Sequence, residues 1–233
     1  MLLKIGMIGT GNMGRALGLR FALAGHDVKF GGRDPDASPA DASRRARELL
    51  GKQTSFGTLS EAAQYGNLLL WTPRERDPIK VFPSEFDLTA LKGKIVVDLN
   101  NRDYAEDVIG PDPKWFTESL GEQLQSHFPE SNVVRCFNII PMGMLDAPRE
   151  ELERGNAQVF IAAQVVEKLA GDVGFDSVQL GGSKTAMRAI GALGDIIRFV
   201  LIDRGIKAAN IGITRVESQA LNIVGPRVES LYR

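Results

Sequence analysis

Short apolar runs alternate with amphipathic stretches along the first two thirds of the chain. Residues 2–9 form an apolar run that ends in glycine, which is typical of a buried parallel strand. In residues 12–24 the apolar positions recur at helical spacing, and Gly25 follows where a helix is expected to end. The start of the chain is therefore predicted to form a strand followed by a helix.

The same alternation continues along the chain and predicts its fold class. Because strands separated by helices usually form parallel sheets through right-handed crossovers, we expect an α/β protein with a doubly wound, mostly parallel sheet of the Rossmann type over residues 1–165. The further strands are predicted at 27–32, 53–57, 67–73, within 91–101, at 132–138 and at 157–163, and the helices at 37–50, 60–66 and 115–128.

Residues 166–233 have a different pattern and are predicted to form a smaller, α-rich C-terminal region. A helix at 165–175 and a strand at 176–182 precede a long helix at 184–204, which Gly205 closes. This long helix is apolar on most sides. A wide apolar face must be covered, so we expect the helix to be buried or to form the contact of a homodimer.

The long helix is not expected to cross a membrane. Arg188, Asp195 and Arg198 interrupt it, and charges are costly at membrane depth. Gly191 and Gly194 would let another element approach the helix closely.

The net charge and the cysteine content of the chain make some classes of function less favourable. The formal net charge of −1 offers no basic field for nucleic acid. The single cysteine, Cys136, lies in a predicted strand, and we expect a small buried side chain there rather than a nucleophile. The chain reaches a glycine motif at once, which leaves no room for a signal peptide, so a soluble, cytoplasmic protein is expected.

The sequence also lacks the usual signals of metal or nucleophilic chemistry. The two histidines, His26 and His127, are expected in a turn and late in a helix, away from the strand ends where a substrate would bind. Patterns of the H-E-x-x-H, C-x-x-C and G-x-S-x-G types are absent. No metal site and no catalytic acid or base is therefore predicted.

The segment "GTGNMG" is the strongest chemical signal. Gly9, Gly11 and Gly14 have the G-x-G-x-x-G spacing between a predicted strand and a predicted helix. Gly9 would allow the tight turn, Gly11 would leave space for a pyrophosphate, and Gly14 would let the helix pack on the strand. Free N–H groups at the helix N-terminus attract phosphate, so we expect a dinucleotide here.

The end of the second strand indicates which dinucleotide. Domains that prefer NAD place an acidic residue at this point, whereas this chain has Gly31, Gly32 and then Arg33. A guanidinium can bind a 2′-phosphate through two hydrogen bonds, which favours NADP. Asp34 follows directly, and it could turn outward or pair with Arg33.

Three later strands end in residues that suit the binding of a cofactor ring. These are Thr72 and Pro73, Asn100 and Asn101, and the run from Asn138 to Pro141. Direct hydride transfer between two cofactors needs stacked rings and excluded water rather than an acid or base. The asparagines could equally serve to form turns.

Several segments together resemble one family. They are "KIGMIGTGNMGRALGLRFALAGHDVKFGGRDP", "LLLWTP", "IVVDLNN", "LGEQLQSHFPESNVVRCFNIIP" and "GFDSVQLGG", within residues 4–183. They resemble the NADP oxidoreductases that depend on the deazaflavin coenzyme F-420, and also the cytoplasmic reductase part of the six-transmembrane metalloreductases.

The resemblance implies roles for individual residues. Thr10, Gly11, Asn12 and Met13 would hold the pyrophosphate, and Arg33 the 2′-phosphate. Thr72 and Pro73 would lie along the cofactor, with Asn138, Ile139 and Pro141 near the nicotinamide. The region after residue 165 would help to form a second-cofactor site. The residues predicted to bind the cofactor are Gly9, Thr10, Gly11, Asn12, Met13, Gly14, Gly32, Arg33, Thr72, Pro73, Asn100, Asn138, Ile139 and Pro141.

We therefore expect an NADP-dependent oxidoreductase that passes a hydride between NADP(H) and a deazaflavin (coenzyme F-420) or a flavin, FMN or FAD. Two alternatives remain open. One is a reductase of a small imine or hydroxy acid, because related enzymes share the "GTGNMG" loop. The other is a protein that binds NADPH without turnover.

Overall fold

The computed structural model describes residues 2–32, 52–75, 77–206 and 209–214. Its main element is a parallel six-stranded sheet in the order β3-β2-β1-β4-β5-β6. This is the strand order of a Rossmann fold, and it confirms the predicted fold class. The strands are β1 (Lys4–Ile8), β2 (Asp27–Gly32), β3 (Thr54–Thr58), β4 (Leu68–Trp71), β5 (Ile95–Asp98) and β6 (Asn132–Arg135).

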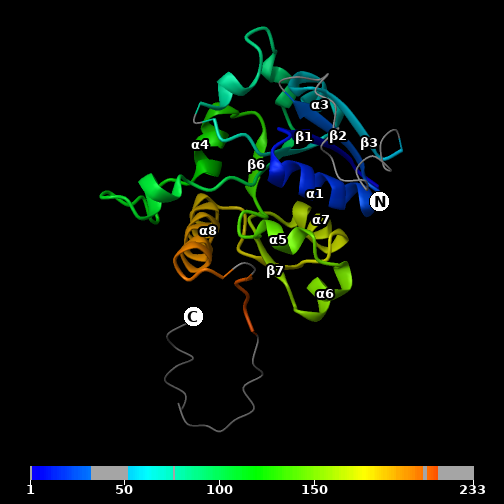
Figure 1. Cartoon of the computed structure of the whole chain (residues 1–233). Helices are drawn as coiled ribbons and strands as arrows, with labels where there is room; N and C mark the ends of the chain where they lie inside the picture. The colour runs from blue at the N-terminus through cyan, green and yellow to red at the C-terminus, as the bar shows by residue number, and fades with distance from the viewer. Residues whose placement is uncertain (1, 33–51, 76, 207–208, 215–233) are drawn as a thin grey trace, which may run out of the picture.

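Helices pack on both faces of this sheet, as Figure 1 shows. One apolar core lies around α1 (Asn12–Leu23), and a second lies under α3 (Leu59–Tyr65) and α4 (Leu120–His127). The short 3₁₀ helices η2 (Pro78–Val81) and η3 (Leu88–Leu91) and the π-helix η4 (Tyr104–Val108) lie in the connections. The predicted helix 37–50 lies outside the described residues.

The helix predicted at 115–128 begins at residue 120 instead. The side chain of Ser119 accepts a hydrogen bond from the N–H of Glu122, and the Glu122 carboxylate accepts one from the N–H of Ser119. This reciprocal capping box fixes the first turn. Phe116, just upstream, has a φ of 59°, so the backbone there cannot be part of the helix.

The expectation that the strand at 157–163 continues the main sheet is wrong. β7 (Gln158–Ile161) pairs in parallel with β8 (Asp176–Gln179) in a separate two-stranded sheet. A backbone hydrogen bond from Ala162 N to Arg135 O connects the end of this strand to β6. The division of the chain near residue 165 stays a prediction. Four further helices lie between β6 and β8: α5 (Met142–Leu145), α6 (Arg149–Arg154), η5 (Gln164–Val166) and α7 (Glu167–Asp172).

Two side chains of the first βαβ unit bind the chain that follows β6. The Arg20 guanidinium donates to the carbonyl oxygens of Leu145, Ala147 and Val173. His26 accepts a hydrogen bond from the N–H of Leu3 on Nδ1, and its Nε2 lies 3.1 Å from an Asp172 carboxylate oxygen. Burial lowers the pKa of His26, and Asp172 opposes this effect. His26 is thus a buried connector between two parts of the fold.

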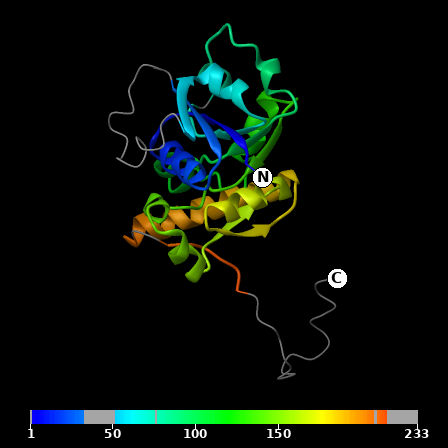
Figure 2. The ribbon, with the colours of Figure 1, turned by 90° about the vertical axis from the view of Figure 1, so that its right-hand side faces the viewer.

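The predicted long helix is confirmed as α8 (Lys184–Asp203), which Ser183 caps through a hydrogen bond to the N–H of Ala186. In Figures 1 and 2 the yellow and orange C-terminal elements lie together below the main sheet, and α8 runs past the end of β6 and past α4. None of the described helices is long and apolar enough to cross a membrane.

Candidate functional site

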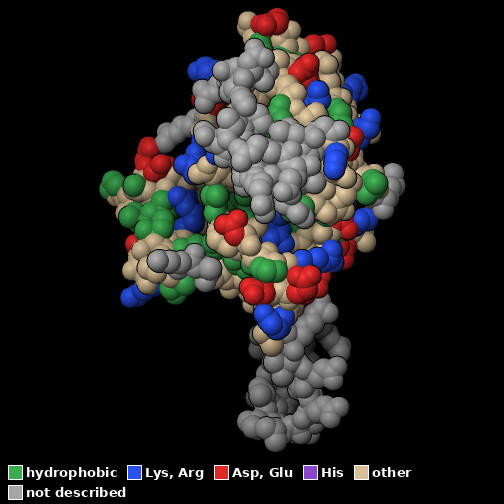
Figure 3. Space-filling view, turned by 45° about the vertical axis from the view of Figure 1, so that its right-hand side comes forward, with side chains coloured by type: hydrophobic (Ala, Val, Ile, Leu, Met, Phe, Trp, Pro, Cys, Tyr) green, Lys and Arg blue, Asp and Glu red, His purple; other side chains and the backbone are tan. Residues whose placement is uncertain are grey.

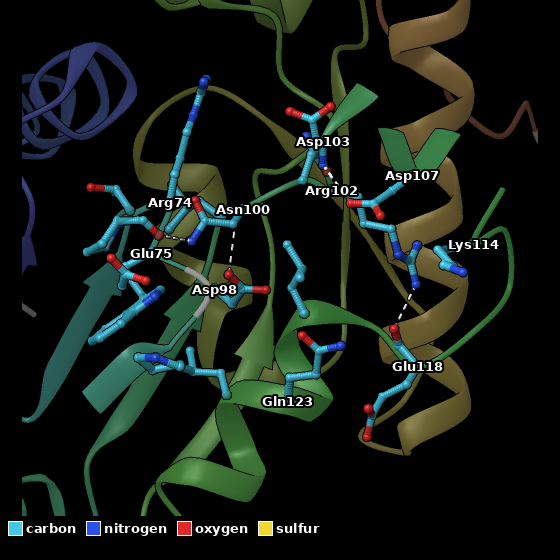
Figure 4. A pocket seen from close by; sticks show the side chains of 18 of the residues that line it. Arg74, Glu75, Asp98, Asn100, Arg102, Asp103, Asp107, Lys114, Glu118 and Gln123 are labelled. Atoms are coloured by element: carbon cyan, nitrogen blue, oxygen red, sulfur yellow. Dashed lines mark hydrogen bonds between the residues drawn. The ribbon is translucent and has the colours of Figure 1, made fainter. Parts of the chain in front are cut away.

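A cleft of about 610 Å³ opens at the carboxyl ends of β4 and β5. Its walls come from the start of α1, from residues 71–75 after β4 and 98–103 after β5, from parts of 107–118, from α4 and from Arg198 of α8. In Figure 4, Asp98 and Asn100 lie in its middle, with Arg74 and Glu75 on one side and Asp107, Lys114 and Glu118 on the other. Ligands of doubly wound sheets bind at such a place, beside the point where strand order reverses.

The glycine loop borders this cleft, and its three glycines have different surroundings. Gly9 has a φ of 101°, which glycine tolerates and other residues rarely adopt. A Cβ on Gly14 would lie 2.7 Å from the Gly9 carbonyl oxygen, so only glycine lets α1 approach so closely. A Cβ on Gly11 would meet nothing within 4 Å. Gly9 and Gly14 therefore have the turn and packing roles predicted for them, whereas the role of Gly11 beside a pyrophosphate stays a prediction.

The N-terminus of α1 is open to an anion. Gly11 is the N-cap and offers no side chain to the first N–H groups of the helix. The neighbouring Asn12 side chain accepts from Arg15 instead. Helix N–H groups without a side-chain partner, next to a glycine with free space, form a cradle that suits a pyrophosphate.

Thr72 supports the glycine loop from behind. Its hydroxyl donates to the carbonyl oxygen of Ile8, at 2.8 Å, and it would lie 2.5 Å from a Cβ on Gly9. The hydroxyl therefore holds the end of β4 against the end of β1. Thr72, Pro73, Asn100 and Met13 are the predicted cofactor-binding residues that line the cleft.

A buried ion pair forms the floor of the cleft. Asp98 and Arg135 are each 1% exposed, and Arg135 Nη1 lies 3.0 Å from Asp98 Oδ2 without the angles of a hydrogen bond. Burial raises the pKa of the Asp98 carboxyl, and the Arg135 guanidinium and the N–H of Asn100 oppose the rise.

This pair fixes the backbone of Asn100 from both sides. The N–H of Asn100 donates to Asp98 Oδ1, and its carbonyl oxygen accepts from Arg135 Nη2. The Asn100 side chain then donates to the carbonyl oxygen of Pro73, at 2.8 Å. The loops after β4 and β5 are therefore joined across the cleft by one asparagine.

Asn138 is engaged inside the protein. Its amide nitrogen donates to Asn101 Oδ1 and to the carbonyl oxygen of Ile190 in α8, and Asn101 donates back to the carbonyl oxygen of Asn138. Neither Asn138 nor the buried Ile139 is among the side chains that line the cleft, and Pro141 is the N-cap of α5. Their role beside a nicotinamide stays a prediction.

The prediction that α8 glycines allow close approach is confirmed at Gly194. A Cβ there would lie 2.3 Å from Asn101 Oδ1 and 2.5 Å from Asn138 Nδ2. α8 is also held by a buried ion pair between Arg102 and Asp195, at 3.0 Å. Gly32 ends β2, and Arg33 lies outside the described residues.

The cleft carries more charge than the neutral strand ends suggested. Sequence reasoning did not assign site roles to Arg74, Asp98, Arg102 or Arg198, all of which line it. Two signals were present: Arg74 follows Thr72 and Pro73 directly, and Asp98 interrupts an apolar strand.

Cys136 and His127, which were not expected to take part in chemistry, both lie away from the cleft. Cys136 is fully buried, and burial raises the pKa of its thiol. His127 contacts the carbonyl oxygen of Gln123 within its own helix. In the described part of the chain no group of three His, Cys, Asp or Glu side chains is arranged to bind a metal ion.

The glycine loop permits a direct test. Gly11→Ala places a methyl group in space that is open in the protein alone, at a backbone φ of −65° that alanine accepts. If the pyrophosphate uses this space, we expect NADPH affinity to fall on the order of tenfold or more, with the melting temperature changed by less than about 2 °C. Isothermal titration calorimetry and differential scanning calorimetry measure the two quantities.

The matched control for this test is Gly171→Ala in α7, another site where a Cβ would meet nothing within 4 Å. It should leave NADPH binding as it is. An unchanged affinity in Gly11→Ala would show that the nucleotide does not use the loop.

Comparison with known proteins agrees with this geometry. Residues 4–102 match the model of the family described as NADP oxidoreductase coenzyme F420-dependent. A putative F420-dependent NADP-reductase from Arthrobacter sp. FB24 is similar over 91% of this chain and 100% of its own, with 26% identity and a TM-score of 0.72. An imine reductase from Myxococcus stipitatus, 15% identical, covers 88% of this chain and 62% of its own at a TM-score of 0.55, and shows the fold alone.

Curated relatives include the metalloreductase STEAP3 of Rattus norvegicus, 29% identical over 190 residues, and STEAP2 of Mus musculus, 27% identical over 189. Both similarities cover 78% of this chain, but 35% and 34% of the relatives, so the chain spans about a third of their length. Taken with the fold and the glycine loop, these findings show that residues 4–102 are similar to the coenzyme F420-dependent NADP oxidoreductases, and that the similarity to this group extends over most of the chain.

Proposed function

We propose that the protein transfers a hydride between NADP(H) and a deazaflavin, coenzyme F-420, or a flavin. The observation that carries this proposal is the position of the open glycine loop beside a cleft whose opposite wall is α8. One side of the cleft suits a nucleotide, and the remaining space suits a second ring system. Direct transfer between two rings needs them to be positioned and shielded from water rather than an acid or base.

The residues present fit NADP(H). The N–H groups after Gly11 would bind the pyrophosphate, and Arg33 would bind the 2′-phosphate. When bound, the cofactor supplies the hydride itself. The chain contributes position: Thr72 holds the glycine loop, and Asn100 joins the two loops that form the cleft floor. The apolar faces of Trp71 and Pro78 help to exclude water.

The choice of a deazaflavin or flavin as partner is supported by the relatives. The family model and the Arthrobacter protein are described by dependence on F420. The names of the metalloreductase relatives indicate metal reduction. If this chain reduced a ferric ion, the ion would be a substrate, and a reduced flavin would pass the electrons to it.

A stopped-flow screen tests the proposed partner. NADPH absorbance at saturating protein is followed after mixing with oxidised F-420, FMN, FAD, a ferric chelate, or a cyclic imine. We expect oxidation at about 1 per second or faster with a deazaflavin or flavin, within the ordinary range for enzymes. Oxidation by the imine alone would favour an imine reductase, and oxidation by none of them would favour a non-catalytic NADPH-binding protein.

The cofactor preference rests on Arg33. We expect Arg33→Ala to weaken NADPH binding by about 1–3 kcal/mol, because a charged hydrogen bond to the 2′-phosphate is lost, and to leave NADH binding almost unchanged. Calorimetric titrations with both cofactors measure this. Arg154→Ala removes an equal charge at a position with 78% exposure and is the control. Equal losses for the two cofactors would contradict the assignment.

We also propose a homodimer. Hydrophobic side chains remain on the surface near the end of α8, where Phe199 and Ile202 are 39% and 55% exposed, and in the segment before α4, where Phe116 is 65% exposed. Figure 3 shows part of the apolar surface in green. Light scattering at micromolar concentration should give twice the 25.4 kDa chain mass, and Ile202→Glu should reduce it to the monomer. A monomer in the unmodified protein would refute the dimer.

A further inference from the structure

The two walls of the cleft differ in the cations that they present. On the nucleotide side lie the glycine loop and the end of β4. The opposite side is formed by residues 103–118 and by α8, whose cleft-lining side chain is Arg198. If the proposed function holds, the cofactor occupies the first side, and the second substrate must meet the second.

Arg198 is held firmly in this wall. Its Nη1 donates to the carbonyl oxygen of Arg102, and its guanidinium carbon lies 5.1 Å from the centre of the Tyr104 ring, a cation–π contact. Tyr104 is itself fixed by a hydrogen bond to Asp203, at 2.7 Å. One of the five N–H donors of Arg198 is thus used, and the orientation of the others is set by its neighbours.

The charge of Arg198 has no direct counter-ion among the described residues. The nearest acid on its own helix, Asp195, is 1% exposed and pairs with Arg102. Lys114, another cation of the cleft, pairs with Asp112. Arg198 is therefore a half-buried guanidinium that faces a cavity without a carboxylate bound to it.

The surroundings of Arg198 oppose its charge. Burial lowers its pKa, Asp195 opposes this, and the positive charge of Arg74 lowers the pKa further, while Asp103 raises it. Arg74 lines the same cleft from the loop after β4 and makes no hydrogen bond or ion pair with the described residues. Arg74 and Arg198 therefore line the same cleft from different elements, Arg74 from the loop after β4 and Arg198 from α8.

Two acids of the same wall, Asp103 and Asp107, accept hydrogen bonds from nearby backbone N–H groups. Asp103 accepts from the N–H of Glu106, and Asp107 accepts from the N–H of Asp103. These bonds cap the N-terminus of the π-helix η4 and hold both carboxylates against its backbone. Arg102 and Lys114, the other cations that line the cleft, pair with Asp195 and Asp112, so Arg198 and Arg74 are the cleft cations without an ion pair to a described residue.

We propose that Arg198 holds the anionic group of the second substrate, while Arg74 adds a second positive charge to the cleft from the loop after β4, so that the protein selects a redox partner that carries a phosphate or carboxylate. This assignment rests on the proposed function for its place in catalysis. The binding itself depends on the charges of the two arginines. An anion bound at Arg198 would use its free N–H donors, as guanidinium groups do with phosphate.

The experiment compares two flavins that differ by one phosphate. Binding of FMN and of riboflavin is measured by the anisotropy of flavin fluorescence, with NADP⁺ present at saturation. We expect FMN to bind the unmodified protein more tightly than riboflavin. Arg198→Gln should raise the dissociation constant of FMN about tenfold and leave that of riboflavin unchanged, because one charge-assisted contact is lost. Arg74→Gln should act in the same direction.

Further variants separate binding from folding. Arg198→Lys keeps the charge and should restore most of the FMN affinity, whereas Arg154→Gln, far from the cleft on α6, should change neither flavin. Calorimetry should show unchanged NADPH affinity in Arg198→Gln and a melting temperature close to that of the unmodified protein.

Three results would overturn the proposal: no preference of the unmodified protein for FMN, equal loss of FMN and riboflavin in Arg198→Gln, or a loss of NADPH binding instead. A phosphate-dependent binding of FMN without NADPH oxidation would support the anion site and refute the proposed hydride transfer to flavin. The two failures are therefore distinguishable.

Discussion

The buried ion pair between Asp98 and Arg135 is the interaction on which the site depends. Each side chain is 1% exposed, so each charge needs the other, and removal of one partner alone would leave an uncompensated buried charge. Together they hold both backbone polar groups of Asn100. A Cβ on Gly121 would lie 2.8 Å from Arg135 Cγ, so α4 can pack on the pair only because it presents a glycine there.

A second layer of contacts makes α8 part of the cleft. Asn101 and Asn138 bond to each other, Asn138 reaches the Ile190 carbonyl, and Gly194 lies directly against both asparagines. Glu122 of α4 adds a paired contact to Arg188, at 2.9 and 3.0 Å, and despite its burial its pKa is lowered by this partner. These contacts fix α8 against the end of the sheet and α4. Its Arg198 can therefore line the cleft.

These contacts show that the polar residues after the strands have a structural role besides the cofactor-binding role predicted for them. Thr72, Asn100 and Asn138 all follow strands, as residues that bind cofactors often do. In the structure their side chains first hold the loops and α8 together. In our proposals the ligands are bound instead by the exposed backbone of the glycine loop and by Arg198, so that the scaffold and the binding groups are separate.

The sequence by itself determined the fold class and the nucleotide loop, because apolar periodicity and glycine spacing are local properties that the backbone must obey. It also indicated that glycines of α8 meet another element. It placed β7 in the wrong sheet, since an apolar run does not specify its partner strand, and it began α4 too early. Only the tertiary structure decided that Asn138 bonds to α8, that Asp98 pairs with Arg135, and that Arg198 enters the cleft. These contacts join residues from 37 to 96 positions apart, and no local pattern encodes which distant groups meet.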